Sequence, residues 1–306
     1  MGTDIVIVAE GLQFPEGPIA MSDGSILLVE IRNGYLTRVK PNGEVERLVH
    51  LGGGPNGAAI GPDGAVYVVN DGGFAWASTE VGIIPGGTPA DYVSGSVQRV
   101  DLATGAWKTL YTACDGVPLR GPNDIVFDKH GGFYFTDLAK WNDNFQQWGA
   151  VYYAAADGSE IKALRRGILT PNGIGLSPDG KVLYVAESLT ARLWAFDILA
   201  PGVLAEPLGP WKLGRHIWSA KGLAIYDSLA VEADGRVCVA TVIRGGVDVI
   251  SADGSSCEII PMAAEMTTNI CFGGADMKTT WITASNTGQL YRCRWPRPGL
   301  KLAFNA

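Results

Sequence analysis

A turn followed by a short run of alternating apolar side chains recurs along the chain. The turn is Asp-Gly before the apolar runs 26–29, 66–69, 182–185 and 237–239, and it is degenerate before 133–135 and 281–283. Asp-Gly between apolar runs is typical of a β-hairpin whose turn positions both have positive φ. The pattern therefore predicts six hairpins, with turns at Asp23-Gly24, Asp63-Gly64, His130-Gly131, Asp179-Gly180, Asp234-Gly235 and Asp276-Met277.

Further strands are expected after each hairpin. Third strands are predicted at 34–39, 95–100, 149–153, 192–196, 247–250 and 289–293, and fourth strands at 45–49, 107–111, 161–164, 211–214 and 258–261. The last repeat lacks a fourth strand, whereas 4–9 is a strand without a repeat of its own. The sequence therefore predicts an all-β, six-bladed β-propeller with four-stranded blades over residues 1–306, a single domain closed by the N-terminal strand. The Gly- and Pro-rich insertion 72–92 is expected to be a loop over one face.

One polar residue stands seven positions before each turn. The six residues are Glu16, Asn56, Asn123, Asn172, Asp227 and Asn269. Because rotation about the channel relates equivalent positions of successive blades, we expect these side chains to converge in one ring. The turn preference of Asn and Asp explains any single position equally well. It does not explain Glu16, or the restriction of acids to two blades.

Two carboxylates and several amide oxygens are the donors that a hard divalent cation prefers. Ca²⁺ and Mg²⁺ favour all-oxygen ligands, and Mn²⁺ or Fe²⁺ accept them, whereas structural zinc prefers Cys or His. Glu16 and Asp227 together would neutralise a doubly charged ion. Without the ion, their repulsion would raise a pKa. The sequence predicts one divalent metal ion, with Ca²⁺ the first choice and Mg, Mn, Fe or Zn as alternatives.

Around these positions the chain resembles the SMP-30/gluconolactonase/LRE-like family. The resemblance is carried by Phe14-Pro15-Glu16-Gly17-Pro18, Gly121-Pro122-Asn123-Asp124, the run 171–180 and the run 227–235. It implies a six-bladed propeller, hydrolysis of aldonolactones such as gluconolactone, and a metal ion held by Glu16, Asn172 and Asp227. It also implies that Asn123 lies beside the metal and contacts the substrate. The chain departs from the family pattern at Ser228, where glycine is commoner, and at Gly121, where some sugar-lactone members carry arginine; Arg120 adjoins that position.

The predicted activity is therefore that of a lactonase acting on a sugar-type lactone with metal-activated water. Asp227 is expected to act as the general base, and Asn123 to hydrogen-bond the substrate or the developing oxyanion. Further substrate contacts are predicted at Asn56, Asn269, Trp76 and Tyr226, with Phe74 and Trp141 as other candidates for the pocket mouth. Aromatic residues in propellers more often pack between blades.

Composition limits which kinds of binding partner are expected. Lys and Arg number 24 against 31 Asp and Glu, giving a net charge of −7, and no basic run is present, so nucleic acid is not an expected partner. No apolar stretch reaches the roughly 18 residues of a membrane span. The five cysteines lack CxxC spacing and the N-terminus lacks an export signal, so a cytoplasmic location is expected. The sequence gives no indication of the oligomeric state.

The same residues are compatible with two other functions. The same metal site would also serve hydrolysis of an aromatic lactone or ester, an isomerase or a lyase, because fold and metal do not fix the reaction. Alternatively, the propeller would be a non-catalytic binding scaffold. The scaffold predicts no convergent pair of acids in the channel.

Overall fold

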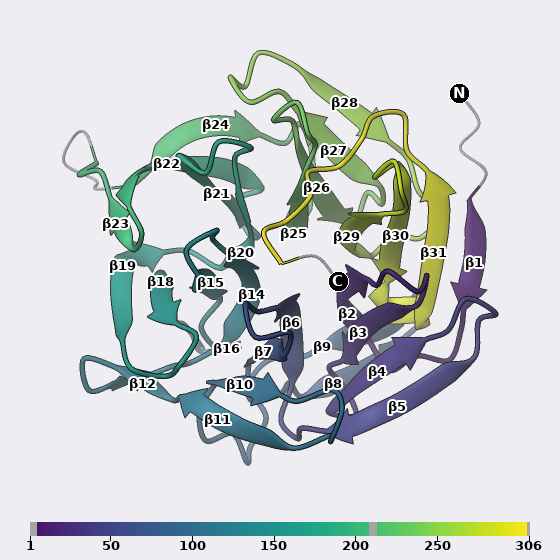
Figure 1. The fold of residues 1–306 in the computed structure, drawn as a ribbon, viewed down its shortest axis with the longest axis horizontal. Helices are drawn as coiled ribbons and strands as arrows, with labels where there is room; N and C mark the ends of the chain where they lie inside the picture. Colours follow the sequence, from purple (N-terminus) through teal and green to yellow (C-terminus); the bar gives the residue numbers. More distant parts are fainter. Residues whose placement is uncertain (1–4, 208–212, 305–306) are drawn as a thin grey trace.

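The predicted hairpins lie in six separate antiparallel sheets arranged around a central axis (Figure 1). The computed structural model describes residues 5–207 and 213–304. Each sheet has four principal strands, and only one short 3-10 helix, η1 (Ser285–Thr287), occurs in the described part of the chain. The prediction of an all-β, six-bladed propeller is confirmed.

The blades follow one another along the chain, each with its innermost strand first. The first three blades are β2 (Pro15–Ala20), β3 (Ile26–Glu30), β4 (Tyr35–Val39) and β5 (Val45–His50); β6 (Pro55–Ile60), β7 (Val66–Asn70), β10 (Ser96–Val100) and β11 (Trp107–Tyr111); and β14 (Pro122–Phe127), β15 (Gly132–Asp137), β18 (Gly149–Ala155) and β19 (Ile161–Ile168). The next two are β20 (Pro171–Leu176), β21 (Val182–Glu187), β22 (Arg192–Ala200) and β24 (Arg215–Ser219); and β25 (Ile225–Val231), β26 (Val237–Val242), β27 (Val247–Ile250) and β28 (Cys257–Ile260).

The sixth blade combines both ends of the chain. Its strands are β29 (Thr267–Gly273), β30 (Thr279–Ala284), β31 (Gln289–Arg294) and β1 (Val6–Ala9). β1 pairs antiparallel with β31, with Val6 opposite Arg292 and Ile7 opposite Tyr291. This pairing covers the outer edge of β31, an edge that would otherwise be free to pair with another chain.

Two sequence expectations need correction. The fourth strand of blade 4 is β24, Arg215–Ser219, rather than 211–214, and Trp211 and Lys212 lie outside the described residues. The insertion 72–92 is more than a loop, because it contains the hairpin of β8 (Trp76–Thr79) and β9 (Gly82–Pro85). Other short pairs are β12 (Ala113–Cys114) with β13 (Val117–Pro118), and β16 (Trp141–Asn142) with β17 (Phe145–Gln146), while β23 (Val203–Leu204) pairs with β22.

The turns of the hairpins also differ from the expected type. Only the glycine of each Asp-Gly pair has a positive φ, for example Gly24 at 82° and Gly180 at 70°. The aspartate instead accepts a hydrogen bond from the backbone N–H two residues later, as Asp23 does from Ser25 at 2.9 Å. Short polar side chains favour such turns. In the degenerate sixth copy, Met277 takes the glycine position with φ 55°.

Apolar strands bury both of their faces between neighbouring blades. All five residues of β3 and of β7 are buried, as are all six of β15. Between blades 2 and 3, the Tyr67 ring packs 5.0 Å from that of Phe127 and 5.9 Å from that of Phe133. These contacts are made by blades without help from the channel residues. None of the described helices has the length and apolar character needed to cross a bilayer.

The C-terminal segment returns to the middle of the ring, where Figure 1 shows it in yellow. The Leu300 N–H donates to the Val231 carbonyl at 2.8 Å, and the Phe304 ring packs edge-on against Phe127 at 5.9 Å. Residues 300–304 therefore cover one end of the channel. The opposite end carries the polar residues described next.

Candidate functional site

The six innermost strands form a closed ring around the channel. Each contacts the next, from β2 to β6, β14, β20, β25 and β29, and β29 returns to β2 (Figure 1). The six polar positions found in the sequence lie at the second or third residue of these strands. Five are buried, and Asp227 is partly buried.

Glycine allows the inner strands to approach one another closely. A Cβ on Gly57 would lie 2.6 Å from the Asn123 carbonyl oxygen, and one on Gly173 would lie 2.7 Å from that of Asp227. Gly17 stands in the same relation to Asn56, at 2.9 Å. Because side chains cannot be accommodated at such distances, the glycine after a polar ring residue sets how near the next ring residue comes.

Five of the six polar residues line one cavity of about 280 Å³ at the open end of the channel. We call it the ring cavity, and its polar floor is made by Glu16, Asn56, Asn123, Asn172 and Asp227. The sixth, Asn269, lies on the other side of the ring, where its Nδ2 donates to Glu16 Oε2 at 2.9 Å. Asn269 therefore orients a floor residue and does not line the ring cavity.

Two oxygens of the floor have no partner. Asn123 Oδ1 and Asn172 Oδ1 are both buried and accept no hydrogen bond from the described residues. A buried polar atom without a partner costs free energy, so such an atom calls for a ligand. With the carboxylates of Glu16 and Asp227, these amide oxygens form an all-oxygen donor set that fits a hard divalent cation.

The acids of the site are hard to ionise in the absence of a cation. Burial raises the pKa of Glu16 from 4.5 to about 6, although hydrogen bonds from Thr268 and Asn269 oppose the shift. Burial, and then the charge of Glu16, raise the pKa of Asp227 well above its usual range. A hydrogen bond from Asn172 acts in the opposite direction. A bound dication would reverse this arrangement by favouring both anions.

Asn56 is held by a buried chain of polar groups that the sequence did not indicate. Its Nδ2 donates to Asp71 Oδ2 at 3.0 Å, and Asp71 Oδ1 is 3.3 Å from the ammonium of Lys140. Lys140 is 1% exposed and also donates to the Gly73 carbonyl at 2.8 Å. Because its nitrogen is engaged by Asp71, the Asn56 amide has a fixed orientation. The repeat pattern does not identify Lys140, because this residue lies beyond the end of β15 in a connection that does not recur in the other blades.

Above the polar floor, the wall of the ring cavity is mostly apolar. It includes Phe14, Ile31, Phe74, Trp141 and Met266. Phe74 and Trp141 were candidates for this place, whereas Phe14, Ile31 and Met266 were not foreseen. Phe14 directly precedes the first ring strand, Ile31 follows β3 and Met266 precedes β29, so their positions beside strand ends are the signal that would have found them.

Two predicted substrate contacts lie elsewhere. Trp76 packs behind the wall, with its ring 5.0 Å from that of Phe14 and 5.8 Å from that of Phe74. Tyr226 is fully buried in the core between blades, where its hydroxyl donates to Asp248 at 2.9 Å. Alternation along β25 turns its side chain away from the channel, and we withdraw it as a substrate contact.

The departures from the family pattern also have structural counterparts. A Cβ at Gly121 would lie 2.6 Å from the Ala139 carbonyl oxygen, so the segment that leads to Lys140 closes over this position. Arg120 lines a separate surface pocket with Asp137 and Trp148 and does not reach the ring cavity. Ser228 is buried, and its side chain is among the groups that oppose the raised pKa of Asp124.

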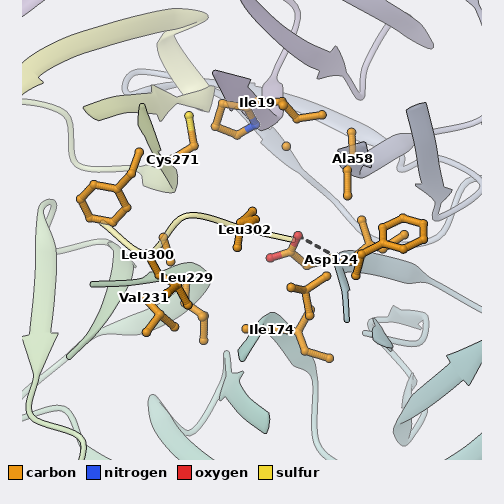
Figure 2. Close-up of a pocket in the computed structure, with 18 of the residues that line it drawn as sticks. Ile19, Ala58, Asp124, Ile174, Leu229, Val231, Cys271, Leu300 and Leu302 are labelled. Carbon is orange, nitrogen blue, oxygen red and sulfur yellow. Dashed lines mark hydrogen bonds between the residues drawn. The ribbon is translucent and has the colours of Figure 1, made fainter. Parts of the chain in front are cut away.

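A second cavity of about 120 Å³ lies beneath the ring, and Figure 2 shows it. It is lined by apolar residues such as Ile174 and Leu229 and is covered by Leu300 and Leu302 of the C-terminal segment. Asp124 points into it (Figure 2). Burial, with a smaller effect of the Glu16 charge, raises the pKa of Asp124 to about 7. We call this the tail cavity.

Comparisons with known proteins cover most of the chain. A family model described as the SMP-30/gluconolactonase/LRE-like region matches residues 14–286. A gluconolactonase of Zymomonas mobilis is 25% identical over 94% of this chain and 80% of its own length. Lactonase drp35 of Staphylococcus aureus is 30% identical over 81% of this chain and 69% of its own length.

Solved structures agree on the fold. A gluconolactonase from Xanthomonas campestris superposes with a TM-score of 0.75 at 20% identity, covering 96% of this chain and 90% of that one. Regucalcin of Agrobacterium tumefaciens, described as a calcium-binding protein, gives a TM-score of 0.71 at 18% identity and covers 99% and 98%. With the family model spanning nearly all blades, the chain belongs to the SMP-30/gluconolactonase/LRE-like family.

Proposed function

We propose that this protein is a metal-dependent lactonase, which adds water to the carbonyl of a lactone and opens its ring. Relatives named gluconolactonase and lactonase support lactone hydrolysis. The observation that carries the proposal is the ring-cavity floor, where two buried acids with raised pKa values accompany two amide oxygens without partners. This combination costs free energy in the metal-free fold and is typical of a binding site.

The ion would be held by Glu16, Asp227, Asn172 and Asn123. A bound dication supplies a Lewis acid, which polarises a carbonyl oxygen and lowers the pKa of water. Ca²⁺ is our first choice because every donor is an oxygen and the floor offers neither His nor Cys among the described residues. The similarity to a protein described as calcium-binding supports the same choice.

The proposed reaction assigns a proton to each step. Asp227 accepts a proton from the attacking water as the water oxygen bonds to the lactone carbonyl carbon. The Asn123 amide N–H donates to the oxygen on which negative charge develops. When the ring C–O bond breaks, Asp227 returns the proton to the departing alkoxide, so the products are a hydroxy acid and the unchanged enzyme. Asn56 contributes a polar contact in an orientation fixed by its bond to Asp71.

The expected substrate was a sugar-type lactone. Its support is the name of relatives at about a quarter identity. The chemistry above needs no polar residue specific to a sugar, so the reaction does not determine the substrate. The substrate class depends on the side chains in the wall of the ring cavity.

The alternatives are weaker on the same observations. A non-catalytic scaffold gives no reason for Glu16 and Asp227 to share a buried cavity with unpartnered amide oxygens. Isomerase or lyase chemistry has no specific feature in its favour.

The cysteines bear on the cellular location. All five are free, and three are buried, as expected of a chain that folds in a reducing compartment. This supports the cytoplasmic location.

Two substitutions test the proposal. In metal-loaded protein, Asp227→Asn should lower kcat on the best lactone by about 10²-fold or more, the usual loss when a general base is removed. Glu16→Gln should weaken metal binding, measured by calorimetry, while circular dichroism stays that of a folded β protein. Asp253→Asn, in an exposed turn, serves as the control. Wild-type turnover by metal-replete Asp227→Asn would rule out the base.

A further inference from the structure

We infer that the ring cavity selects a lactone carrying an aromatic substituent over a polyhydroxylated one. The inference rests on the proposed function for the reaction itself, and it adds the class of substrate. It comes from the composition and rigidity of the wall above the polar floor.

The wall offers few partners for substrate hydroxyls. None of the described residues that line the ring cavity is Lys, Arg or His. Of the polar wall residues, Thr170 accepts a hydrogen bond from the Leu189 N–H at 3.1 Å, and Gln146 donates to the Gln147 carbonyl at 2.8 Å. Ser188 Oγ is buried without a partner among the described residues, so the wall offers a substrate one buried free hydroxyl. A sugar lactone carries hydroxyls around its ring, and most would be desolvated here without a partner, which opposes binding.

An aromatic substituent, in contrast, finds aromatic and apolar side chains to pack against. Phe14, Phe74 and Trp141 line the side of the cavity built by blades 1 to 3. The Phe74 and Trp141 rings lie 5.4 Å apart at an interplanar angle of 47°, a tilted arrangement that leaves ring faces and edges to pack against a further ring. Apolar side chains continue the wall on the other side, at Ile225, Val242 and Met266.

The aromatic wall is also held in place. The Lys140 ammonium lies 4.5 Å from the centroid of the Phe74 ring, and that same ammonium is fixed by Asp71 and the Gly73 carbonyl. Trp76 packs edge-on against Phe74 from the β8–β9 hairpin. A wall fixed before binding loses little conformational freedom when a ring enters, so packing energy is retained as affinity.

The test uses δ-lactones that share a secondary alkoxide leaving group. These are δ-phenyl-δ-valerolactone, δ-hexalactone, which has methyl in place of phenyl, and D-glucono-δ-lactone. With calcium-loaded protein, and each rate divided by that of uncatalysed hydrolysis, the phenyl compound should have a kcat/KM about tenfold or more above that of either other lactone. A higher value for gluconolactone would overturn the inference.

A matched pair of variants locates the preference. Trp141→Ala should raise KM for the phenyl compound about tenfold and change δ-hexalactone less than about twofold, because only the phenyl ring reaches the wall. Trp107→Ala, on the exposed outer strand β11, should change neither. An equal effect of Trp141→Ala on both lactones would assign it a structural role and count against the inference.

A binding measurement distinguishes the proposed hydrolysis from the proposed preference for an aromatic substituent. Calorimetry should show that 5-hydroxy-5-phenylpentanoate, the phenyl product, binds about tenfold or more tighter than gluconate and loses this advantage in Trp141→Ala. If no lactone is hydrolysed but the phenyl acid still binds preferentially, the proposed reaction fails and the preference of the wall stands. If hydrolysis occurs and gluconate binds more tightly, the reaction stands and the preference fails.

Discussion

Asn269 Nδ2 donates to Glu16 Oε2 at 2.9 Å, joining residues 253 positions apart in the chain. The bond crosses from β29 of the last blade to β2 of the first, where the ring of inner strands returns to its start. The same oxygen also accepts a hydrogen bond from the Gly17 N–H at 3.2 Å, so two donors fix Glu16 Oε2. Asn269 is therefore a positioning residue for the proposed metal ligand.

Removing this donor should weaken the metal site without unfolding the protein. Asn269→Leu is expected to lower the affinity for Ca²⁺ about tenfold, because groups that orient a ligand commonly contribute that much. Isothermal titration calorimetry measures the change. Asn42→Leu, in an exposed turn of blade 1, is the control. Unchanged affinity in Asn269→Leu would show that Glu16 needs no support from blade 6.

The raised pKa of Glu16 predicts how stability depends on pH in the metal-free protein. An acid whose pKa is raised by folding, here from 4.5 to about 6, binds its proton more tightly in the native state. Its stabilising contribution is complete below pH 4.5 and is lost as the pH rises through about 6. Glu16→Gln should therefore be more stable than wild type at pH 8, by about 2 kcal/mol, and no more stable at pH 4.

Urea denaturation at the two pH values, in the presence of a chelator, measures this difference. Saturating Ca²⁺ should reverse the order at pH 8, because the ion stabilises only the protein that retains both acids. An advantage of Glu16→Gln that does not change with pH would show that the carboxylate is not the cause.

Close approach of the inner strands predicts a steric effect at Gly57. Its Cβ would meet the Asn123 carbonyl oxygen and the Asp124 Cα within 2.7 Å, and neither backbone atom can move alone. Gly57→Ala should lower the free energy of unfolding by about 1–3 kcal/mol and weaken metal binding by displacing Asn123.

Gly86→Ala provides the comparison, since its nearest contact would be 3.5 Å away and its φ is not positive. Chemical denaturation should give a change within about 0.5 kcal/mol for this variant. Similar losses for both substitutions would mean that the approach of β6 to β14 is not tight.

The C-terminal segment predicts a loss of stability without loss of activity. Phe304 is partly buried against Phe127 on the side of the ring opposite the ring cavity. Phe304→Ala should lower the free energy of unfolding by about 1–2 kcal/mol while kcat/KM stays within twofold. Thermal and chemical denaturation, with a lactone assay, measure both. A large loss of activity would mean that the tail cavity influences the floor.

The repeat explains why so much was predictable from sequence. Asp-Gly turns fix the number of blades, and counting back from them identified Glu16 and Asp227 as members of one ring. Because rotation about the channel axis relates the blades, equivalent positions in all of them face the same channel. The turn type was predicted wrongly because the aspartate side chain bonds its own backbone, so only glycine needs positive φ.

What the repeat does not contain was not predictable. Lys140 and Asp71 belong to connections that occur once, and no periodicity reports that they meet. Tyr226 adjoins a ring residue in sequence, yet alternation along a strand sends neighbouring side chains to opposite faces. The hairpin inside 72–92 has strands of only four residues, and its turn at Glu80-Val81 lacks the Asp-Gly pair that marks the others.

The order of the inner strands has a last consequence. The two acids stand on blades 1 and 5, with Asn269 on the blade between them, while blades 2 to 4 contribute only amides. Six positions related by near-symmetry thus carry charge on one flank alone. A flat guest in the channel therefore meets negative charge at one edge only, so the two orientations that exchange its edges are inequivalent to the protein.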